Sequence, residues 1–284
     1  MTTFQLSKSA RSLLFGALVL LFVLIIILPI WYIFLTAFVS GPKLFTQPLT
    51  YIPTEVSFDR FTAVLDSLPI WRYLFNTVFL AVSSTLIALL VSLLAAYAIA
   101  RVEFRGANLV LIGLLASSML PPFTTIIPLF QMYQTLKLMN TLHGLLILYV
   151  SGMLPVTTWV LVAFIRQIPS EIEDAARVDG AEFWRMLWYI TVPLLRPGMV
   201  TMGLINFIVG WNEFFIPLIF ARGIESKVIT MALSEAQAVG SSTQFYQNWG
   251  NMSAVAIIAT VPVFLLTLFF QRQITDGISS GAIK

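Results

Sequence analysis

Cysteine is absent from this chain of 284 residues, and histidine occurs once, as His143. The absence of cysteine excludes disulfide bonds, thiolate metal sites and cysteine nucleophiles, and it leaves the redox compartment undetermined. A membrane enzyme would need several histidine or carboxylate side chains clustered at one depth, so a single histidine argues against that class. His143 stands near the outer start of an apolar stretch, where we expect a structural or solvated role and no metal site or proton transfer.

Charged side chains are also scarce. They make up 10% of the residues, against about 25% in a typical soluble domain, whereas 58% of the residues are hydrophobic. This surplus of apolar residues is too large for a water-soluble core of this size, and it indicates a lipid bilayer as the solvent. The net charge is only +3 and the basic residues are scattered, so the sequence suggests no nucleic-acid partner.

Long stretches without charge dominate the chain instead. A transmembrane helix needs about 20 mostly apolar residues, and six stretches meet this length, with Glu213 as the one charged residue inside them. The expected spans are residues 13–38, 73–100, 109–130, 142–165, 197–221 and 252–270, in one transmembrane domain that covers 1–284. The predicted fold class is therefore an all-α membrane protein with six transmembrane helices.

The basic residues give the orientation of these spans. An even number of spans places both termini on one side, together with the loops at 101–107 and 166–196. That side holds ten of the 16 Lys and Arg residues, and the other side holds six. Because cytoplasmic loops carry an excess of Lys and Arg, both termini are expected in the cytoplasm.

The loop 166–196 contains a short polar helix at "SEIEDAARVDG". Ser170 and Glu173 have the spacing of a capping box, and acids in the first turns favour the positive end of the helix dipole. Gly180 is placed to end the helix in a left-handed C-cap. A helix of about ten residues is about 15 Å long, too short to span a bilayer.

Such a short helix is marginal by itself and needs a surface to pack against. The small side chains of Ala175 and Ala176 allow close approach of a partner, and the acidic rim can accept hydrogen bonds from it. A helix that merely caps the bundle is the alternative. The following stretch, 181–193, is amphipathic, and its Trp and Tyr side chains suit the membrane interface.

The same loop resembles the signature of binding-protein-dependent ABC importer permeases, which is Glu-Ala-Ala, three residues, Gly, nine residues, and Ile-x-Leu-Pro. Here 174–176 reads Asp-Ala-Ala, Gly180 follows at the same spacing, and 190–193 reads Ile-Thr-Val-Pro. The departures are Asp174 for Glu and Val192 for Leu. "IPSEIEDAARVDGA", "WNEFFIPLIF" at 211–220 and "GAIK" at 281–284 are similar to the maltose-type carbohydrate branch of this family.

The resemblance implies a type I ABC importer permease, in which the short helix is a cytoplasmic coupling helix that sits in a cleft of a separate ATP-hydrolysing subunit. The chain has no Gly-x-x-x-x-Gly-Lys-[Ser/Thr] phosphate loop. We therefore expect no catalysis and no cofactor on this chain, with ATP and Mg bound by its partners. The residues implied in coupling are Glu173, Asp174, Ala175, Ala176, Gly180 and Pro193, and Gly281 and Lys284 in the tail are implied to reach between the ATPase subunits.

The implied partners are a second related permease subunit, two ATP-binding subunits and an extracytoplasmic sugar-binding protein, in the cytoplasmic membrane of a bacterium or archaeon. The outer loop 222–251 is implied to reach into the binding protein. Its sugar-compatible residues are Gln244, Tyr246, Gln247, Asn248 and Trp249. An ordinary solvated loop with an aromatic anchor is the alternative for this segment.

Glu213 is the candidate for a polar path through the bilayer. It lies nine residues before Arg222, roughly 13 Å along a helix, where a charge costs about 2.5–3.5 kcal/mol on insertion scales. Together with Asn206, Trp211 and Asn212 it could line a sugar path. Hydrogen bonding between helices is the alternative, and it is favoured for Asn206.

The function predicted from these features is the permease subunit of an ATP-driven sugar importer, which forms half of the translocation path and couples it to separate ATPases. An ABC importer permease for another polar solute is an alternative. An ion-coupled secondary carrier is a further one, but such carriers show inverted repeats and ionisable groups near the midplane. The sequence shows no internal repeat, and Glu213 is the one acidic residue inside the expected spans.

Overall fold

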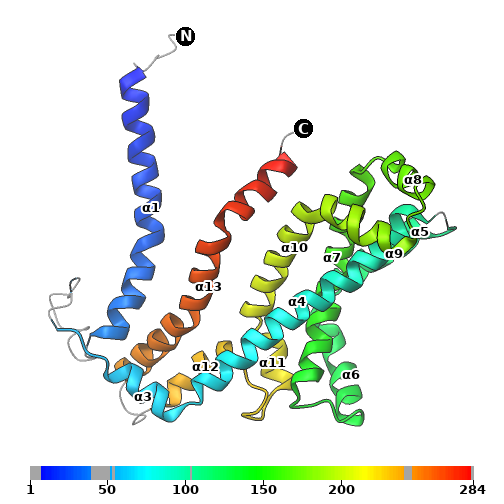
Figure 1. The fold of residues 1–284 in the computed structure, drawn as a ribbon. Helices are drawn as coiled ribbons and strands as arrows, with labels where there is room; N and C mark the ends of the chain where they lie inside the picture. Colours follow the sequence, from blue (N-terminus) through cyan, green and yellow to red (C-terminus); the bar gives the residue numbers. More distant parts are fainter. Residues whose placement is uncertain (1–7, 40–51, 53–54, 103, 240–244, 283–284) are drawn as a thin grey trace, which may run out of the picture. The chain divides into compact units, whose positions relative to one another are not determined.

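The computed structural model describes residues 8–39, 52, 55–102, 104–239 and 245–282, and within these ranges the chain contains helices and no β-strand (Figure 1). This confirms the all-α fold class. Five helices are long and apolar enough to cross a membrane, and a bent pair of helices makes a sixth if it counts as one span. The chain divides into two compact units, residues 1–68 with 232–261 and residues 69–231 with 262–284.

The first unit is built on α1 (Lys8–Phe38), α3 (Asp59–Ser67) and the first part of α13 (Phe245–Ala282). The Thr36 hydroxyl lies 2.6 Å from the Ser253 hydroxyl, which joins α1 to α13. Phe38 packs against two phenylalanine rings beside and within α3, with ring centroids 5.4 and 4.8 Å away. The apolar side chains of the preceding part of α1 are exposed, as expected for a helix that faces lipid or another chain.

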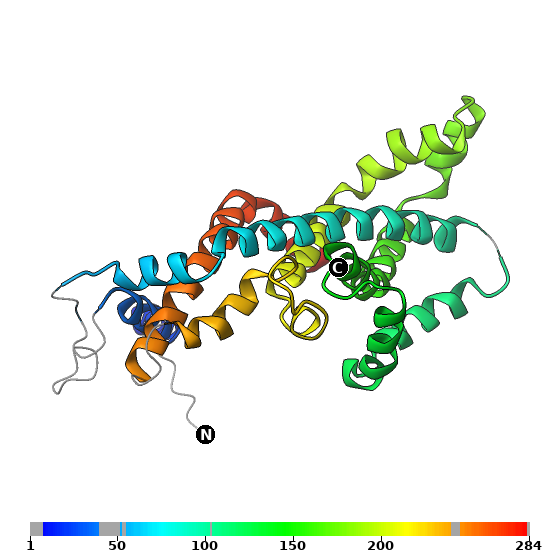
Figure 2. The ribbon, with the colours of Figure 1, turned by 90° about the horizontal axis from the view of Figure 1, so that it is seen from below.

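The second unit is built on α4 (Ile70–Arg101), α7 (Leu142–Gln167) and α10 (Val192–Asn212), which pack side by side (Figures 1 and 2). Small residues allow this close approach. A Cβ atom added at Gly210 would come within 3.2 Å of the backbone of Ala81, and one added at Gly198 within 2.8 Å of the Phe164 ring. The glycines of α10 therefore set its distance from α4 and α7.

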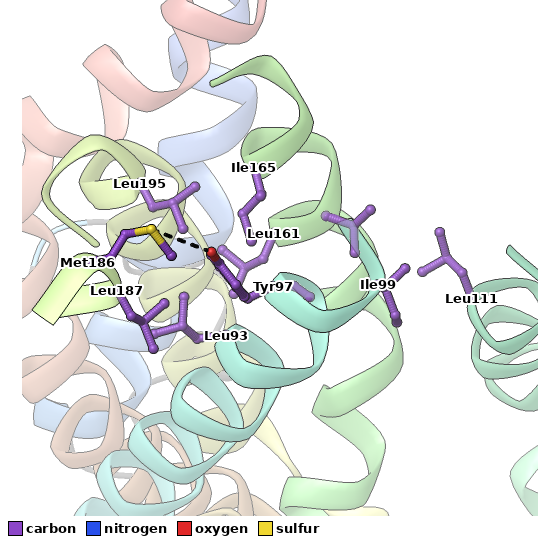
Figure 3. Packing of buried hydrophobic residues seen from close by; sticks show 11 residues of the cluster. Leu93, Tyr97, Ile99, Leu111, Leu161, Ile165, Met186, Leu187 and Leu195 are labelled. Carbon is purple, nitrogen blue, oxygen red and sulfur yellow. Dashed lines mark hydrogen bonds between the residues drawn. The ribbon is translucent and has the colours of Figure 1, made fainter. Parts of the chain in front are cut away.

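One of the two buried clusters of this unit that the described residues form lies where the ends of these helices meet (Figure 3), and the other is centred on Leu80, Leu145 and Phe220. Leu93 and Tyr97 of α4, Leu161 and Ile165 of α7, and Leu195 of α10 are all at most 4% exposed. The segment between α7 and α10 adds further buried residues to this core. It consists of α8 (Ser170–Val178), α9 (Phe183–Met186) and the π-helical turn η1 (Leu187–Thr191).

The expected third span is bent in the structure. α5 (Ala107–Ser118) and α6 (Pro122–Thr135) meet at 93°. The bend coincides with Pro121 and Pro122, where Pro121 has an extended backbone and Pro122 is the first residue of α6. Proline cannot donate the backbone hydrogen bond that would continue α5, and it is well tolerated in the first turn of a new helix.

The expected fifth span, 197–221, differs from the helix that the structure contains. The helix capable of spanning is Phe183–Asn212, and it continues through η1 into α10 without a break. The amphipathic stretch 181–193 therefore contributes the first turns of this helix, and its Trp184, Trp188 and Tyr189 are exposed. Arg196, predicted at the end of the loop 166–196, lies inside α10, where a long basic side chain can extend its charge away from apolar surroundings. The helix ends because Glu213 has an extended backbone (φ −65°, ψ 123°), and the short α11 (Phe215–Phe220) follows.

Candidate functional site

The C-terminal end of α8 has the geometry that the sequence predicts. Gly180 has φ of +81°, and its N–H donates to the carbonyl of Arg177 at 3.0 Å. The N–H of Ala181 donates to the carbonyl of Ala176 at 2.9 Å, so the two bonds together form a Schellman motif. Glycine is favoured at this position because side chains of L-residues rarely adopt a positive φ. The predicted left-handed C-cap is confirmed.

The predicted capping box at the other end of α8 is wrong. The helix begins at Ser170 itself, Pro169 precedes it as the N-cap, and no side chain caps the first turn. Glu173 lies in the first turn of the helix, and its carboxylate bonds to Tyr97, Arg101 and Thr191. Its carboxylate has stronger partners elsewhere in the chain, and a charged donor outcompetes a backbone N–H for it.

Glu173 is the centre of a buried polar network that ties α8 to two other helices. Its side chain is 2% exposed. One carboxylate oxygen, Oε2, accepts hydrogen bonds from the Tyr97 hydroxyl and from Arg101 Nε, each at 3.1 Å. The other oxygen, Oε1, accepts from the Thr191 hydroxyl at 3.3 Å. Arg101 also donates from Nη2 to the carbonyl of Ile168 at 2.8 Å, at the end of α7.

This network stands inside the apolar core of Figure 3. The Tyr97 hydroxyl lies 4.0 Å from the sulfur of Met186, and the Phe183 ring meets the Tyr97 ring edge-on, with centroids 5.5 Å apart. Leu93 and Leu187 are fully buried beside them. Apolar surroundings strengthen a hydrogen bond that is made and raise the cost of one that is lost. α8 is therefore held firmly by the carboxylate of a single residue.

Tyr97, Arg101 and Thr191 were not identified from the sequence as functional residues. Tyr97 and Arg101 are four residues apart, a spacing that places two side chains on one face of a helix. Arg101 ends an apolar span and is followed by one more basic residue, Arg105, a pattern typical of an ordinary cytoplasmic flank. Nothing in the sequence pairs these residues with Glu173, which is 72 residues from Arg101.

The residues expected in coupling fall on opposite sides of α8. Glu173 and Ala176 are buried against the chain itself, whereas Asp174 and Ala175 are exposed. Asp174 makes an exposed ion pair with Arg177 at 3.3 Å. The outer surface also carries large apolar side chains, with Ile172 41% and Val178 88% exposed. We call this surface, residues 172, 174, 175 and 178, the outer face of α8.

Pro193 and the tail residues lie away from this face. Pro193 is exposed in the first turn of α10 and lines an apolar groove of about 640 Å³ between α4 and α10. Gly281 belongs to the last turns of α13. Lys284 lies outside the described residues.

The residues expected to meet a binding protein gather at the start of α13. Tyr246, Gln247 and Asn248 are in its first turn, and Gln244 lies outside the described residues. Trp249 is 49% exposed and lines an apolar groove of about 400 Å³ in the first unit, with Tyr32 and other residues of α1 and α13.

Three of the four residues expected along a sugar path make a hydrogen bond or a ring contact within α10 or between α10 and α7. Asn206 is 3% exposed, and its amide donates to the Thr157 hydroxyl at 3.0 Å, which joins α10 to α7. Trp211 is buried, and its ring stacks on Phe207 with centroids 5.7 Å apart. Asn212 is exposed and donates to the carbonyl of Ile208 in its own helix at 2.8 Å.

Glu213 has a different setting, at the break between α10 and α11. Its Oε1 accepts a hydrogen bond from the N–H of Ile216 at 3.0 Å, and its backbone carbonyl accepts one from the Thr230 hydroxyl at 2.8 Å. The side chain is half-buried and lines a cavity of about 200 Å³ together with Tyr149 and Gly152 of α7 and other residues of α7, α10 and α11. Within the described ranges no group of three or more His, Cys, Asp or Glu side chains could hold a metal ion.

Comparisons with known proteins agree with the architecture. Residues 88–280 match the family described as "Binding-protein-dependent transport system inner membrane component". The chain is 31% identical to the diacetylchitobiose uptake system permease protein NgcG of Streptomyces coelicolor, over 94% of this chain and 87% of that protein. It is 35% identical to the trehalose transport system permease protein SugB of Mycobacterium tuberculosis, over 82% and 84%.

It is also 30% identical to the trehalose/maltose transport system permease protein MalG of Thermococcus litoralis, over 96% of each chain. Among solved structures, a chain of a bacterial ABC transporter involved in the import of the acidic polysaccharide alginate matches with a TM-score of 0.82 and 23% identity. The match covers 96% of this chain and 99% of that one. At this identity the likeness bears on the fold alone.

Proposed function

This chain belongs to the family of binding-protein-dependent transport system inner membrane components, the permease subunits of ABC importers, and we propose that the solute it imports is a sugar. Three similar proteins carry names that refer to diacetylchitobiose, trehalose and trehalose/maltose, and together they support a carbohydrate of two or more rings. The family is a multi-pass inner-membrane one, in agreement with the apolar helices. Both termini are proposed to be cytoplasmic, from the excess of basic residues on that side.

The proposed roles of this chain and of its ATP-hydrolysing partner follow from the surface of α8. Its outer face, with exposed Ile172, Asp174, Ala175 and Val178, docks on a separate ATP-hydrolysing subunit. Exposed apolar side chains beside small and charged ones are typical of a protein–protein contact. ATP and Mg bind to that partner, and this chain is a non-catalytic subunit that holds no cofactor. The tail residues Gly281 and Lys284 reach between the two ATPase subunits.

The observation that carries the coupling proposal is the buried carboxylate of Glu173. It bonds directly to Tyr97 and Arg101 of α4 and to Thr191 at the start of the α10 span. A displacement of α8 is therefore transmitted to two helices of the translocation path, because moving α8 alone would leave buried charges without partners. Gly180 stiffens the lever by ending α8 in a defined motif.

The remaining partners are a second, related permease subunit and an extracytoplasmic sugar-binding protein. The exposed apolar side of α1 supports a contact with lipid or with the second permease. The start of α13, with Tyr246, Gln247, Asn248 and Trp249 and the preceding Gln244, is proposed to meet the binding protein. Asn206 and Trp211 are proposed to support the path as packing residues, because they bond to α7 and stack within α10, and Asn212 bonds to the backbone of its own helix.

The test is uptake by the assembled importer in proteoliposomes, with radiolabelled trehalose, maltose and diacetylchitobiose and with ATP inside. We expect uptake of at least one sugar that requires ATP, the ATPase subunits and the binding protein. A matched measurement omits the ATPase and applies an ion gradient. Uptake by this chain alone under the gradient, or ATP-driven uptake of amino acids with none of the three sugars, would contradict the proposal.

A further inference from the structure

The cavity beside Glu213 is also lined by Tyr149, whose buried hydroxyl has no hydrogen-bond partner within the described part of the chain. Tyr149 lies on α7 and is 3% exposed. Buried hydroxyl groups nearly always have a partner, and one without a partner needs an explanation. Tyr149 and Glu213 both line this cavity of about 200 Å³, yet no hydrogen bond joins them.

The two side chains have complementary needs. Among the residues that the structure describes, the Tyr149 hydroxyl is a donor without an acceptor. Glu213 accepts one hydrogen bond on Oε1 from the N–H of Ile216, which leaves acceptor capacity on the carboxylate. An alcohol group between them can accept from the tyrosine and donate to the carboxylate at once. A simple cation would satisfy only the carboxylate, because the phenol's donor hydrogen would stay unpaired.

A larger cavity adjoins this one. It has a volume of about 400 Å³ and shares Leu148, Gly152 and Ile216 with the smaller cavity. Its wall carries the hydroxyl groups of Ser117, Ser118, Thr125 and Ser151. Ser117, Ser118 and Ser151 donate to backbone carbonyls of their own helices, so their oxygens remain free to accept. This volume is within the usual range for small-molecule sites, about 300–1,000 Å³.

Gly152 is where the two cavities meet, and its position is open. A Cβ atom added there would have no atom within 4 Å. Gly210 lines the smaller cavity as well, but a Cβ atom there would press on α4. The absence of a side chain at Gly152 therefore leaves the cavity open, whereas its absence at Gly210 allows α10 to pack closely on α4.

We propose that Tyr149 and Glu213 form a subsite for a sugar hydroxyl, reached through the serine-lined cavity, so that this subunit contacts the transported sugar directly. The inference rests on the proposed function, because it assumes a sugar as solute. Trp211 and Asn206, which resemble sugar-binding residues by type, are not part of this subsite. Tyr149 and Glu213 take that role, and Gly152 leaves room for the sugar.

The experiment uses the complete importer in proteoliposomes and whichever of trehalose, maltose and diacetylchitobiose the wild type transports. Loss of one neutral hydrogen bond changes an equilibrium about threefold to tenfold, and loss of one to a charged group about tenfold to a hundredfold. We expect Tyr149→Phe to lower the maximal uptake rate about threefold to tenfold, and Glu213→Gln more, at saturating loaded binding protein. ATP hydrolysis should continue, so the ratio of sugar to ATP falls.

Two controls separate this role from a structural one. Thr85→Val removes the other buried hydroxyl that lacks a partner among the described residues, and Thr85 lines the groove between α4 and α10. It should leave uptake unchanged. Gly152→Val should block uptake by filling the cavity. Gly113→Val places the same side chain in α5, where an added Cβ atom also meets no atom within 4 Å. Gly113 lines neither cavity, so this variant should leave uptake unchanged.

A series of deoxy analogues of the transported sugar gives the sharpest readout. The analogue without the bound hydroxyl should be transported more slowly than the parent sugar by the wild type, and the difference should be smaller in Tyr149→Phe, which keeps only the bond from the hydroxyl to Glu213. Equal uptake of every analogue by both proteins, or unchanged uptake in Gly152→Val, would overturn the subsite. If the wild type transports none of the three sugars, the proposed function itself fails.

Discussion

Glu173→Gln tests the attachment of α8 most directly. Glutamine keeps the size of the side chain, but it removes the negative charge that faces Arg101 Nε at 3.1 Å. Breaking a buried ion pair by removing one partner costs about 3–5 kcal/mol, and a hydrogen bond to a charged group contributes about 1.5–3 kcal/mol. Arg101 is 12% exposed and keeps its bond to the carbonyl of Ile168 at 2.8 Å, so the smaller cost applies, that of a lost hydrogen bond to a charged group. We expect α8 to lose about 2 kcal/mol of attachment, a factor of about 30 in its docking equilibrium.

The assay is hydrogen exchange at the backbone amides of α8 in the assembled importer without nucleotide, together with the number of sugars imported per ATP. Exchange within Ser170–Val178 should become about 30-fold faster if local opening governs it, and ATP hydrolysis should continue while uptake falls. The matched control is Asp174→Asn, which breaks an exposed pair worth about 0–1 kcal/mol. The control should weaken binding to the ATPase and leave exchange in α8 unchanged. If Glu173→Gln alters neither exchange nor the ratio of sugar to ATP, the carboxylate does not hold the helix.

Three further substitutions follow from single contacts. Gly180→Val places a β-branched residue at φ +81°, at a cost of about 1–2 kcal/mol, and should reduce both uptake and sugar-stimulated ATPase activity. Gly180→Asn should retain most of both activities, because asparagine tolerates this backbone conformation. Equal activity in the two variants would argue against a mechanical role for the C-cap. Asn206→Leu removes the bond to Thr157 and should lower the unfolding temperature of the purified protein by an amount that corresponds to about 1 kcal/mol, with sugar selectivity unchanged; altered selectivity would place Asn206 on the path after all. Gly198→Ala forces a Cβ to 2.8 Å from an aromatic ring of α7 and should destabilise by about 1–3 kcal/mol, whereas Gly203→Ala, with its nearest neighbour at 3.4 Å, should be nearly neutral in the same thermal unfolding measurement.

The ends of α8 show how far local patterns reach. The left-handed conformation of Gly180 could be predicted because a C-cap depends on a few consecutive residues. Ser170 and Glu173 have the spacing of a capping box, but the box does not form because the carboxylate of Glu173 bonds to Arg101 instead. A spacing rule states which bond is possible, and competition with distant groups decides which bond forms.

The fifth span shows the same limit on a larger scale. Charged residues at 185 and 196 made 166–196 look like one continuous loop, whereas the structure runs a helix from Phe183 to Asn212 through both. Charge-free length is a good guide to where a membrane helix can lie. It is a poor guide to where the helix ends, because long basic side chains can extend from inside a helix toward water.

The sequence by itself determined the solvent, the fold class and the presence of a punctuated polar helix on one side of the membrane, because hydrophobic length and helix ends are encoded in neighbouring residues. Only the tertiary structure decided what surrounds each polar side chain. It joined Glu173 to Tyr97, 76 residues away, and it placed Tyr149 in the cavity of Glu213 with no hydrogen-bond partner among the described residues. A side chain's residue type sets which bonds it can make, but the packing of distant helices sets which atoms come within reach, and no local pattern records that.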